Sequence, residues 1–270
     1  MTAAAALFRA VLDRAGHDGR VIQLWWRDDD AVRDGPALGR LLRLSGESHS
    51  PVALAAIPTL IEPSLLARVS NEPLVDVLVH GFSHTNHACA GQKPAEFGPD
   101  RPLATLMEEV RHARALAMDA FGEQVVDVFV PPWNRISPEL AAALPSLGFR
   151  GLSAFGEHGP SSPRPVRVDA HLDPVDWRGG RGLVPPERFA DGLQRALSSG
   201  VGPIGLLTHH LVFDEPLWAL CEEFIGAAAH HPAVRVRSVR GLLRDLSPSS
   251  HRDGRHASLA GASTLSEHAP

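Results

Sequence analysis

Residues 74–87 read Leu-Val-Asp-Val-Leu-Val-His-Gly-Phe-Ser-His-Thr-Asn-His, and this stretch decides the fold. Its first six residues are almost wholly apolar and have the length of a strand. Such strands are typical of a parallel sheet that helices cover on both faces. The polar residues begin at His80, where the strand ends, and in these sheets functional side chains gather at the carboxyl ends of the strands. The stretch therefore predicts an α/β protein with a functional site near His80.

Similar apolar runs lie on both sides of this stretch and alternate with helical periodicity. Strand-like runs cover residues 21–26, 52–57, 125–130, 149–153, 203–208 and 234–237. Helix-like segments cover 36–44, 63–69, 102–121, 185–199 and 216–229, and a further helix begins after Ser137. This order predicts a parallel sheet or a barrel. We expect a single domain over residues 1–246 and a disordered tail over 247–270, which is rich in Ser, Ala, Gly and His.

The composition excludes several classes of protein. Lys and Arg number 26 against 31 Asp and Glu, a net charge of −5, and no basic run occurs, so we expect no nucleic-acid partner. Cys89 and Cys221 are too few for a disulfide framework or a Cys-rich zinc site. No apolar run is long enough to span a membrane, and Arg9, Asp13 and Arg14 interrupt any signal-like segment. We therefore expect a cytoplasmic protein, and the outlying number is its 15 histidines.

An acidic cluster, Arg27-Asp28-Asp29-Asp30, directly follows the run at 21–26. Three adjacent carboxylates repel one another, so a bound cation or neighbouring arginines must compensate for their charge. A solvated acidic turn is the simpler alternative. The position at a strand end favours a functional role.

Three histidines follow the run at 74–79 within eight residues. The i, i+4 spacing of His80 and His84 would put both rings on one side of a helical turn, which is a metal-ligand spacing. A carboxylate from another strand would complete a three-ligand site with an open position for water. The alternative is a surface cluster of histidines. For His87, supporting, substrate-binding and structural roles all stay open.

Three more polar clusters lie at residues 130–135, 171–178 and 206–210. Trp133 would offer a flat wall for a sugar ring, and a place in the core is an equal alternative. The carboxylate and arginine at 176–178 could position a catalytic group, although local evidence favours a structural ion pair. His209 ends a predicted strand and would serve as a general acid, with a core histidine as the alternative. The further supporting or substrate-binding candidates are Asn134, Asp176, Trp177, Arg178 and His210.

These five clusters, in this order, resemble the motifs of the NodB-type polysaccharide deacetylases, carbohydrate esterase family 4, over roughly residues 21–215. The strings that carry the resemblance are Arg27-Asp28-Asp29-Asp30-Ala31, His80-Gly81-Phe82-Ser83-His84 with Asn86-His87, Pro131-Pro132-Trp133-Asn134, Asp176-Trp177-Arg178-Gly179 and Leu207-Thr208-His209-His210. They are most similar to a cytoplasmic-looking branch of that family. The resemblance implies a distorted (β/α) barrel, commonly with seven strands.

The resemblance also implies roles for five residues. Asp29 would be the general base and His209 the general acid, and Asp30, His80 and His84 would hold a divalent metal ion, with Zn²⁺ the expected ion. A shift of one position would make Asp28 the base and Asp29 the ligand. The implied reaction is hydrolysis of an N-acetyl group on a sugar or glycan. The oligomeric state is not implied.

This sequence also departs from the family pattern. Val130 stands where the family usually has an arginine that orients the catalytic aspartate, and Arg27, Arg135 or Arg178 could replace it. Asp28 stands where a phenylalanine is usual. Two alternatives therefore stay open: a hydrolase of another small amide or of a cyclic ureide on the same scaffold, and a non-catalytic carbohydrate-binding protein.

Overall fold

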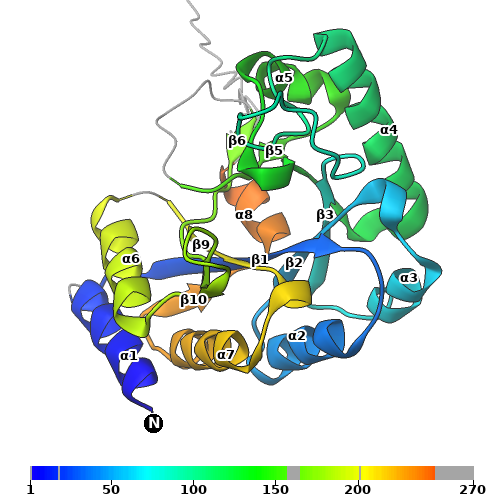
Figure 1. Cartoon of the computed structure of the whole chain (residues 1–270). Helices are drawn as coiled ribbons and strands as arrows, with labels where there is room; N and C mark the ends of the chain where they lie inside the picture. Colours follow the sequence, from blue (N-terminus) through cyan, green and yellow to red (C-terminus); the bar gives the residue numbers. More distant parts are fainter. Residues whose placement is uncertain (1, 18, 157–164, 201, 247–270) are drawn as a thin grey trace, which may run out of the picture.

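The main sheet has eight strands, and every pairing between neighbouring strands in it is parallel (Figure 1). The computed structural model describes residues 2–17, 19–156, 165–200 and 202–246. The strands of this sheet are β1 (Ile22–Ala31), β2 (Val52–Ala56), β3 (Val75–His80), β4 (Val125–Val130), β5 (Gly151–Leu152), β6 (Val166–Arg167), β9 (Ile204–Thr208) and β10 (Val234–Val236). A separate antiparallel hairpin contains β7 (Val175–Asp176) and β8 (Gly182–Leu183).

Seven of the eight strands follow one curled order, β9-β1-β2-β3-β4-β5-β6. β10 pairs only with the first three residues of β1. Beyond β6 the chain reaches β9, where Leu172 forms a parallel bridge with Leu206 and accepts a hydrogen bond from the Leu207 N–H at 2.8 Å. This single bridge closes the ring. The predicted α/β fold, a distorted seven-stranded barrel, is confirmed.

Helices cover the outside of the barrel, as the alternation of segments predicts. They are α1 (Ala3–Gly16), α2 (Pro36–Glu47), α3 (Pro63–Val69), α4 (Leu103–Phe121), α5 (Pro138–Ala143), α6 (Pro186–Ser198), α7 (Glu215–Ala229) and α8 (Val239–Leu246). In Figure 1, α2 and α7 lie side by side beneath β1. Phe8 of α1, Phe189 of α6 and Phe224 of α7 meet edge to face, with ring centroids 5.1–5.6 Å apart. No described helix is long and apolar enough to cross a membrane.

Side chains of β1 alternate between the inside of the barrel and the helical layer, as the period of two requires. Trp25 packs in the inner cluster with Ala53 and Leu78, whereas Leu24 and Trp26 belong to the outer core. The inner cluster is completed from α8, through Val239, Leu242 and Leu243. Consecutive aspartates near the end of β1 are therefore sent into different environments.

The structure differs from the sequence-based elements in the extent of β1 and in several short elements. β1 continues to Ala31, so the aspartates lie within the strand rather than after it. The short β6, the β7–β8 hairpin and α8 were not predicted. The predicted disordered tail at 247–270 lies outside the described residues, and the domain bounds stay a prediction.

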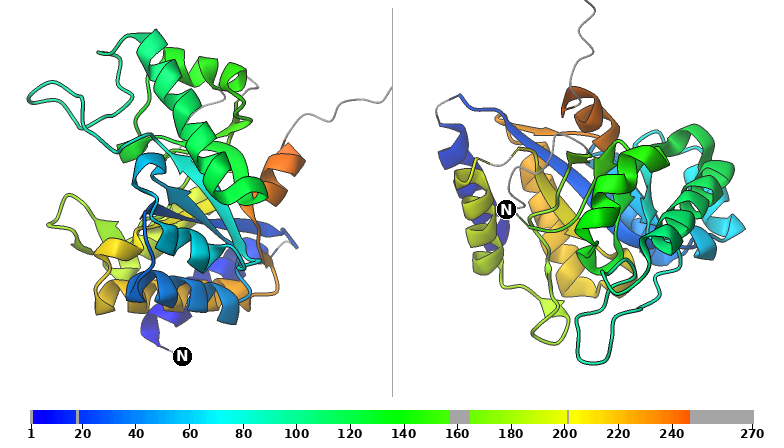
Figure 2. Two further views of the ribbon diagram at one scale, coloured as in Figure 1. Left: turned by 90° about the vertical axis from the view of Figure 1, so that its right-hand side faces the viewer. Right: turned by 90° about the horizontal axis from the view of Figure 1, so that it is seen from above.

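Two loops project on the same side of the molecule, beside the carboxyl ends of the strands. They are the segment that leads from β3 to α4 and the β7–β8 hairpin (Figure 2). Both views show the two segments projecting on the same side, and the left view shows them standing apart from each other. The fold thereby provides walls on two sides of the edge where functional groups gather.

Candidate active site

Asp30, His80 and His84 come together at this edge. The distance from His80 Nε2 to Asp30 Oδ1 is 3.1 Å, and that from His84 Nε2 to the same oxygen is 3.3 Å. One potential ligand atom from each residue lies within 4.8 Å of the others. Asp30 comes from the end of β1, His80 is the last residue of β3, and His84 lies in the loop that follows. The three residues that the sequence predicts as metal ligands therefore form one group.

His80 is held in a defined orientation. Its ring is buried, and Nδ1 lies 3.0 Å from the carbonyl oxygen of Val130. A carbonyl only accepts, so Nδ1 carries the proton, and Nε2 is directed toward Asp30. A backbone partner of this kind is the usual way to orient a metal-binding histidine.

His84 does not lie on a helical turn, and the predicted helical geometry is wrong. The segment after His80 is an irregular loop with positive φ at Gly81 (61°) and His84 (57°). Buried Glu96 holds this loop by accepting hydrogen bonds from the N–H groups of Ser83 at 2.8 Å and Phe82 at 3.1 Å. A carboxylate twelve residues downstream thus sets the position of His84. No sequence pattern marked it, because it lies in a loop without periodicity.

Gly81 is required by close packing as well as by its positive φ. A Cβ atom there would lie 2.2 Å from the Glu96 carboxylate and 2.5 Å from the ring of Pro132. Pro132 precedes Trp133, whose ring centroid lies 4.4 Å from that of His84. The loop, Glu96 and the Pro132–Trp133 turn therefore form one packed unit behind the histidines.

Asp29 points into the barrel and is held by Arg27, two residues earlier on β1. Arg27 Nε lies 2.9 Å from Asp29 Oδ1, and Nη2 donates to Oδ2 at 3.1 Å. The guanidinium, fully buried, also donates to Ser153 Oγ at 2.6 Å and to Asn134 Oδ1 at 2.7 Å. Of the three arginines considered as a replacement at the position of Val130, Arg27 is therefore the one that contacts Asp29.

Asp28 faces the opposite way, into the helical layer. It pairs with His210 Nδ1 through a short contact and accepts hydrogen bonds from the Thr208 hydroxyl at 2.6 Å and the His210 N–H at 3.0 Å. Both side chains are almost fully buried. Burial lowers the pKa of His210, but the charge of Asp28 and the hydrogen bond to it outweigh burial and raise it. His210, expected to support the substrate site, instead joins β9 to β1.

His209 lies in the same cleft as the Asp-His-His group. The cleft has a volume of about 850 Å³ and is lined by Asp29, Asp30, His80, His84, Trp133, Asn134, Asp173, Asp176, Trp177, Arg178 and His209, among others. The Trp177 ring meets the His209 ring edge to face at 4.8 Å. His209 Nδ1 is buried without a hydrogen-bond partner in the described part of the chain. All five residues given roles by the resemblance therefore share one cleft.

Asp173 is a cleft residue that sequence reasoning missed. It accepts hydrogen bonds from Trp177 Nε1 and from the Val175 N–H, both at 2.8 Å. Burial raises the pKa of Asp173, and the charge of nearby His209 only partly opposes this effect. Its position in the cluster at 171–178 was a signal, but the choice between it and Asp176 needed the fold.

Asp176 organises the hairpin turn rather than a catalytic group. Its carboxylate accepts hydrogen bonds from the N–H groups of Arg178 at 3.2 Å and Gly179 at 3.0 Å, and it forms an ion pair with Arg188 at 3.2 Å. Arg178 itself is exposed at the tip of the hairpin. The ion pair considered for this cluster, between Asp176 and Arg178, is absent from the described residues, and Asp176 pairs with Arg188 of α6 instead.

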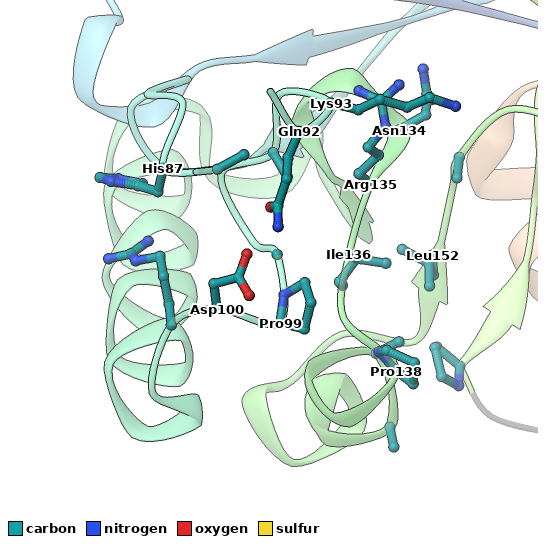
Figure 3. A pocket seen from close by; sticks show the side chains of 18 of the residues that line it. His87, Gln92, Lys93, Pro99, Asp100, Asn134, Arg135, Ile136, Pro138 and Leu152 are labelled. Carbon is teal, nitrogen blue, oxygen red and sulfur yellow. The ribbon is translucent and has the colours of Figure 1, made fainter. Parts of the chain in front are cut away.

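His87 lies outside the cleft. It lines a neighbouring cavity of about 900 Å³, which shares only Asn134 and Arg135 with the cleft. Figure 3 shows His87 on the opposite side of this cavity from Asn134. The structure therefore gives His87 no contact with the other candidate residues.

Backbone strain is concentrated at the candidate site. Among the described residues, six other than glycine have positive φ, and four of them are Asp30, His84, Trp133 and Asn134. Such conformations persist where the surrounding structure enforces them, and they cluster at functional sites.

Asp30 and His80 stabilise each other's charged forms, whereas His84 favours its neutral form. Burial raises the pKa of Asp30, but the hydrogen bond and charge of His80, with the charges of His209 and His84, hold it well below its ordinary range. Burial lowers the pKa of His84, and the charge of His80 adds to this effect. Burial also lowers the pKa of His80, but the charge of Asp29 and the hydrogen bond and charge of Asp30 outweigh burial and raise it. A cation bound at Asp30 would therefore displace a proton from His80, as metal binding at histidine does.

The donor set fits a divalent cation. Two ligand atoms about 2.0–2.1 Å from a tetrahedral Zn²⁺ lie roughly 3.3 Å apart. The observed distances of 3.1 and 3.3 Å from Asp30 Oδ1 to the two imidazole nitrogens agree with that spacing. The orientation of His80 by Val130 supports the same conclusion.

The barrel is the NodB-type fold of known family 4 carbohydrate esterases. A proposed polysaccharide deacetylase from Mycobacterium smegmatis superposes with a TM-score of 0.60 at 15% identity, over 85% of this chain and 91% of that one. A family 4 carbohydrate esterase from Streptomyces lividans in complex with acetate gives 0.52 at 13% identity, over 78% and 90%. A mutant of a CE4 family pseudoenzyme with restored enzymatic activity gives 0.54 at 13% identity, over 83% and 68%. At these identities the similarity shows the fold.

Sequence comparison adds no family assignment. No family model matches the chain, and no curated protein matches it. The chemistry of this chain must therefore be argued from its own residues.

Proposed function

We propose that this chain is a metal-dependent hydrolase of the NodB-type deacetylase family that removes an N-acetyl group from a sugar or glycan. One observation carries the proposal: the Asp30–His80–His84 group, the Arg27-held Asp29 and His209 line a single cleft. A ligand set, a base and an acid in one place are what amide hydrolysis needs. The fold shared with deacetylases supports the same reaction.

The reaction consumes water and yields acetate and an amine. A divalent ion, with Zn²⁺ the expected one, would supply polarisation of the acetyl carbonyl and acidification of the attacking water when bound by Asp30, His80 and His84. Asp29 takes a proton from that water as the carbon–oxygen bond forms. His209 gives a proton to the nitrogen as the carbon–nitrogen bond breaks. Each transfer contributes about 10²–10⁴ to the rate.

Arg27 acts as the positioning residue for Asp29. Its guanidinium contacts both carboxylate oxygens, so it fixes the carboxylate plane as well as its charge. Ser153 and Asn134 fix the guanidinium in turn. Arg27 on β1 thus supplies the positive charge that the family usually supplies from the position of Val130 on β4. The departure from the family pattern at Val130 therefore does not imply lost activity.

Two tryptophans provide the wall for a sugar ring. Trp133 packs against His84, and Trp177, which is 43% exposed, packs against His209. An exposed aromatic surface beside both the ligand group and the acid suits a pyranose ring. This arrangement favours a sugar over a small acyclic amide. The cytoplasmic location and the identity of the ion stay predictions.

A non-catalytic carbohydrate-binding protein is the second candidate, because a pseudoenzyme shares this fold. Binding alone requires neither a base held by a buried arginine nor an enclosed acid. Asp29 and His209 therefore favour the enzyme.

The test is acetate release from N-acetylated sugars by the Zn²⁺-loaded protein, with the free amine measured in parallel. The Asp29→Asn variant should bind the ion and lose about 10²–10⁴ in kcat, because only the base is removed. Asp191→Asn, an exposed change on α6, is the matched control and should have the parent rate. Sugar binding without acetate from any substrate would favour the second candidate. Release of a different product would favour another amide or ureide.

A further inference from the structure

Five arginines line the cleft outside the catalytic group: Arg135, Arg178, Arg181, Arg188 and Arg195. Arg178 and Arg181 lie in the turn between β7 and β8, and Arg188 and Arg195 lie on α6. The last two are seven residues apart, so two helical turns place them on the same face. The hairpin and α6 thus contribute four cations to the lining of the cleft, and the ion pair between Arg188 and Asp176 joins the two elements.

The carboxylates of the cleft already have partners. Asp29 is paired with Arg27, Asp30 lies against two histidines, and Asp176 is paired with Arg188. Asp173 accepts its hydrogen bonds from a tryptophan and a backbone N–H. These acids leave no counter-charge for the remaining arginines.

Four of the five arginines carry charge that no carboxylate of the described residues compensates. Arg178, Arg181 and Arg195 form no ion pair with any residue that the structure describes. Arg135 donates to the Pro94 carbonyl oxygen at 2.7 Å, which leaves its charge uncompensated as well. A chain with a net charge of −5 therefore places four uncompensated arginines in the lining of one cleft. A cleft lined by one sign of charge raises the local concentration of the opposite ion.

The distances between His209, Trp177 and Arg181 indicate the order in which the parts of a substrate would lie in the cleft. The Arg181 guanidinium carbon lies 5.8 Å from the centroid of the Trp177 ring, and that ring contacts His209 at 4.8 Å. The proposed general acid His209, the Trp177 ring and the Arg181 guanidinium therefore lie in this order along the cleft. Arg181 also has a φ of 66°, so the hairpin holds a residue other than glycine in the left-handed region to place this side chain.

We propose that the substrate of this cleft is an N-acetylated sugar that carries a phosphate or diphosphate ester, with the phosphoryl group bound by Arg181 and Arg195 and assisted by Arg178. The proposal rests on the proposed function for the acetamide end of the substrate. Guanidinium groups match phosphate oxygens through paired N–H donors, which makes arginine the usual residue for this task. A neutral glycan would leave the uncompensated arginines without a partner.

The first test compares charged with neutral substrates. We expect kcat/KM for N-acetylglucosamine 1-phosphate or UDP-N-acetylglucosamine to exceed that for N-acetylglucosamine and its neutral trimer by about a hundredfold, since hydrogen bonds between charged groups are the strong ones. The preference should weaken as salt is raised from 20 to 500 mM, roughly, because exposed arginines are screened. The two phosphorylated substrates differ in whether the ester is free or nucleotide-linked, so their ranking identifies the source of the phosphoryl group.

The variants are Arg181→Ala and Arg195→Ala, singly and together. The double variant should lose at least about ten times more kcat/KM for the phosphorylated substrate than for the neutral trimer. Arg43→Ala, an exposed arginine of α2 outside the cleft, should leave both values at the parent level. A preference for the neutral trimer, or an equal loss for both substrates, would overturn the proposal.

A binding measurement separates this proposal from the proposed function. UDP is titrated into metal-free protein, so that an ion cannot hold the phosphates, and the double variant should bind it at least about tenfold more weakly than the parent. Acetate release from neutral sugars alone, with no arginine-dependent UDP binding, would keep the deacetylase and reject the phosphoryl site. Arginine-dependent UDP binding without acetate from any substrate would keep the phosphoryl site and reject the deacetylase.

Discussion

Two Asp–His clusters contain aspartates that lie only two residues apart on β1, Asp28 and Asp30. The clusters share their residue types but differ in burial and in access to the cleft. Asp28 and His210 pair in the helical layer, where both are almost fully buried. Asp30, His80 and His84 meet at the cleft, where the Asp30 side chain is 30% exposed and that of His84 is 23% exposed. The buried pair has its hydrogen bonds within the fold, whereas the open group leaves imidazole nitrogens facing a space that an ion can enter. Access, and not composition, separates a structural pair from a candidate metal centre.

The largest effect is expected from the open cluster. Removing one of its ligands in His84→Ala should abolish stoichiometric Zn²⁺ binding and lower acetate release by more than about 10⁴, because loss of the ion removes both carbonyl polarisation and water activation. Metal analysis after gel filtration and an acetate assay measure the two effects. His230→Ala, an exposed histidine at the end of α7, is the control. Full Zn²⁺ content in His84→Ala would show that His84 is not a ligand and that the open cluster is not the metal site.

The buried cluster should respond in stability instead. His210→Ala leaves Asp28 buried without its cation, and we expect it to lose about 3–5 kcal/mol of unfolding free energy while it still binds the ion. The pKa of His210 is raised above its ordinary 6.5 in the folded state, so the charged pair contributes fully below that pH. Its contribution is lost as the pH rises through the raised pKa.

Urea unfolding of the parent and of His210→Ala between pH 6 and pH 9 measures this contribution. The stability difference between them should shrink as the pH rises. A difference that grows with pH, or loss of bound Zn²⁺ at unchanged stability, would mean that the two clusters have been assigned to the wrong roles.

A smaller effect is expected behind the open cluster. Glu96→Gln keeps the size of the side chain but removes the charge and one acceptor from the loop that places His84. We expect the affinity for Zn²⁺ to fall about 10–100-fold, as for other residues that orient metal ligands. Isothermal titration gives the affinity, and Glu108→Gln, a change on α4 outside the cleft, is the control. Unchanged affinity would show that the loop holds its shape without Glu96.

The two clusters also show which parts of the structure could be predicted from the sequence. The barrel was predictable because its longer strands are apolar runs that end in polar clusters, and His80 could be placed because it ends such a run. The division between Asp28 and Asp29 follows from the period of a strand, but the charges made β1 look shorter than it is. Asp30 departs from that period, because its φ is 69° and the pairing of β1 with β2 shifts register between Asp28 and Ala31. Had β1 been extended to Ala31, the alternation would have sent Asp28 and Asp29 to opposite faces.

Other parts of the site depended on contacts that no local pattern contains. His84 reaches Asp30 because Glu96 bends the loop, so the helical turn expected from the i, i+4 spacing was wrong. Arg27, and not Arg135 or Arg178, holds Asp29, because Asn134 and Ser153 from the far side of the barrel accept hydrogen bonds from its guanidinium. These pairs are distant in sequence and are brought together only by the closed sheet.

The most direct test of the central claim is the position of the ion in a crystal of the Zn²⁺-soaked protein, located by anomalous scattering at the zinc edge. The proposal predicts one peak about 2.0–2.2 Å from Asp30 Oδ1, His80 Nε2 and His84 Nε2, with an open side toward Asp29 and His209. A peak at Asp28 and His210, or no peak in the cleft at saturating Zn²⁺, would contradict it.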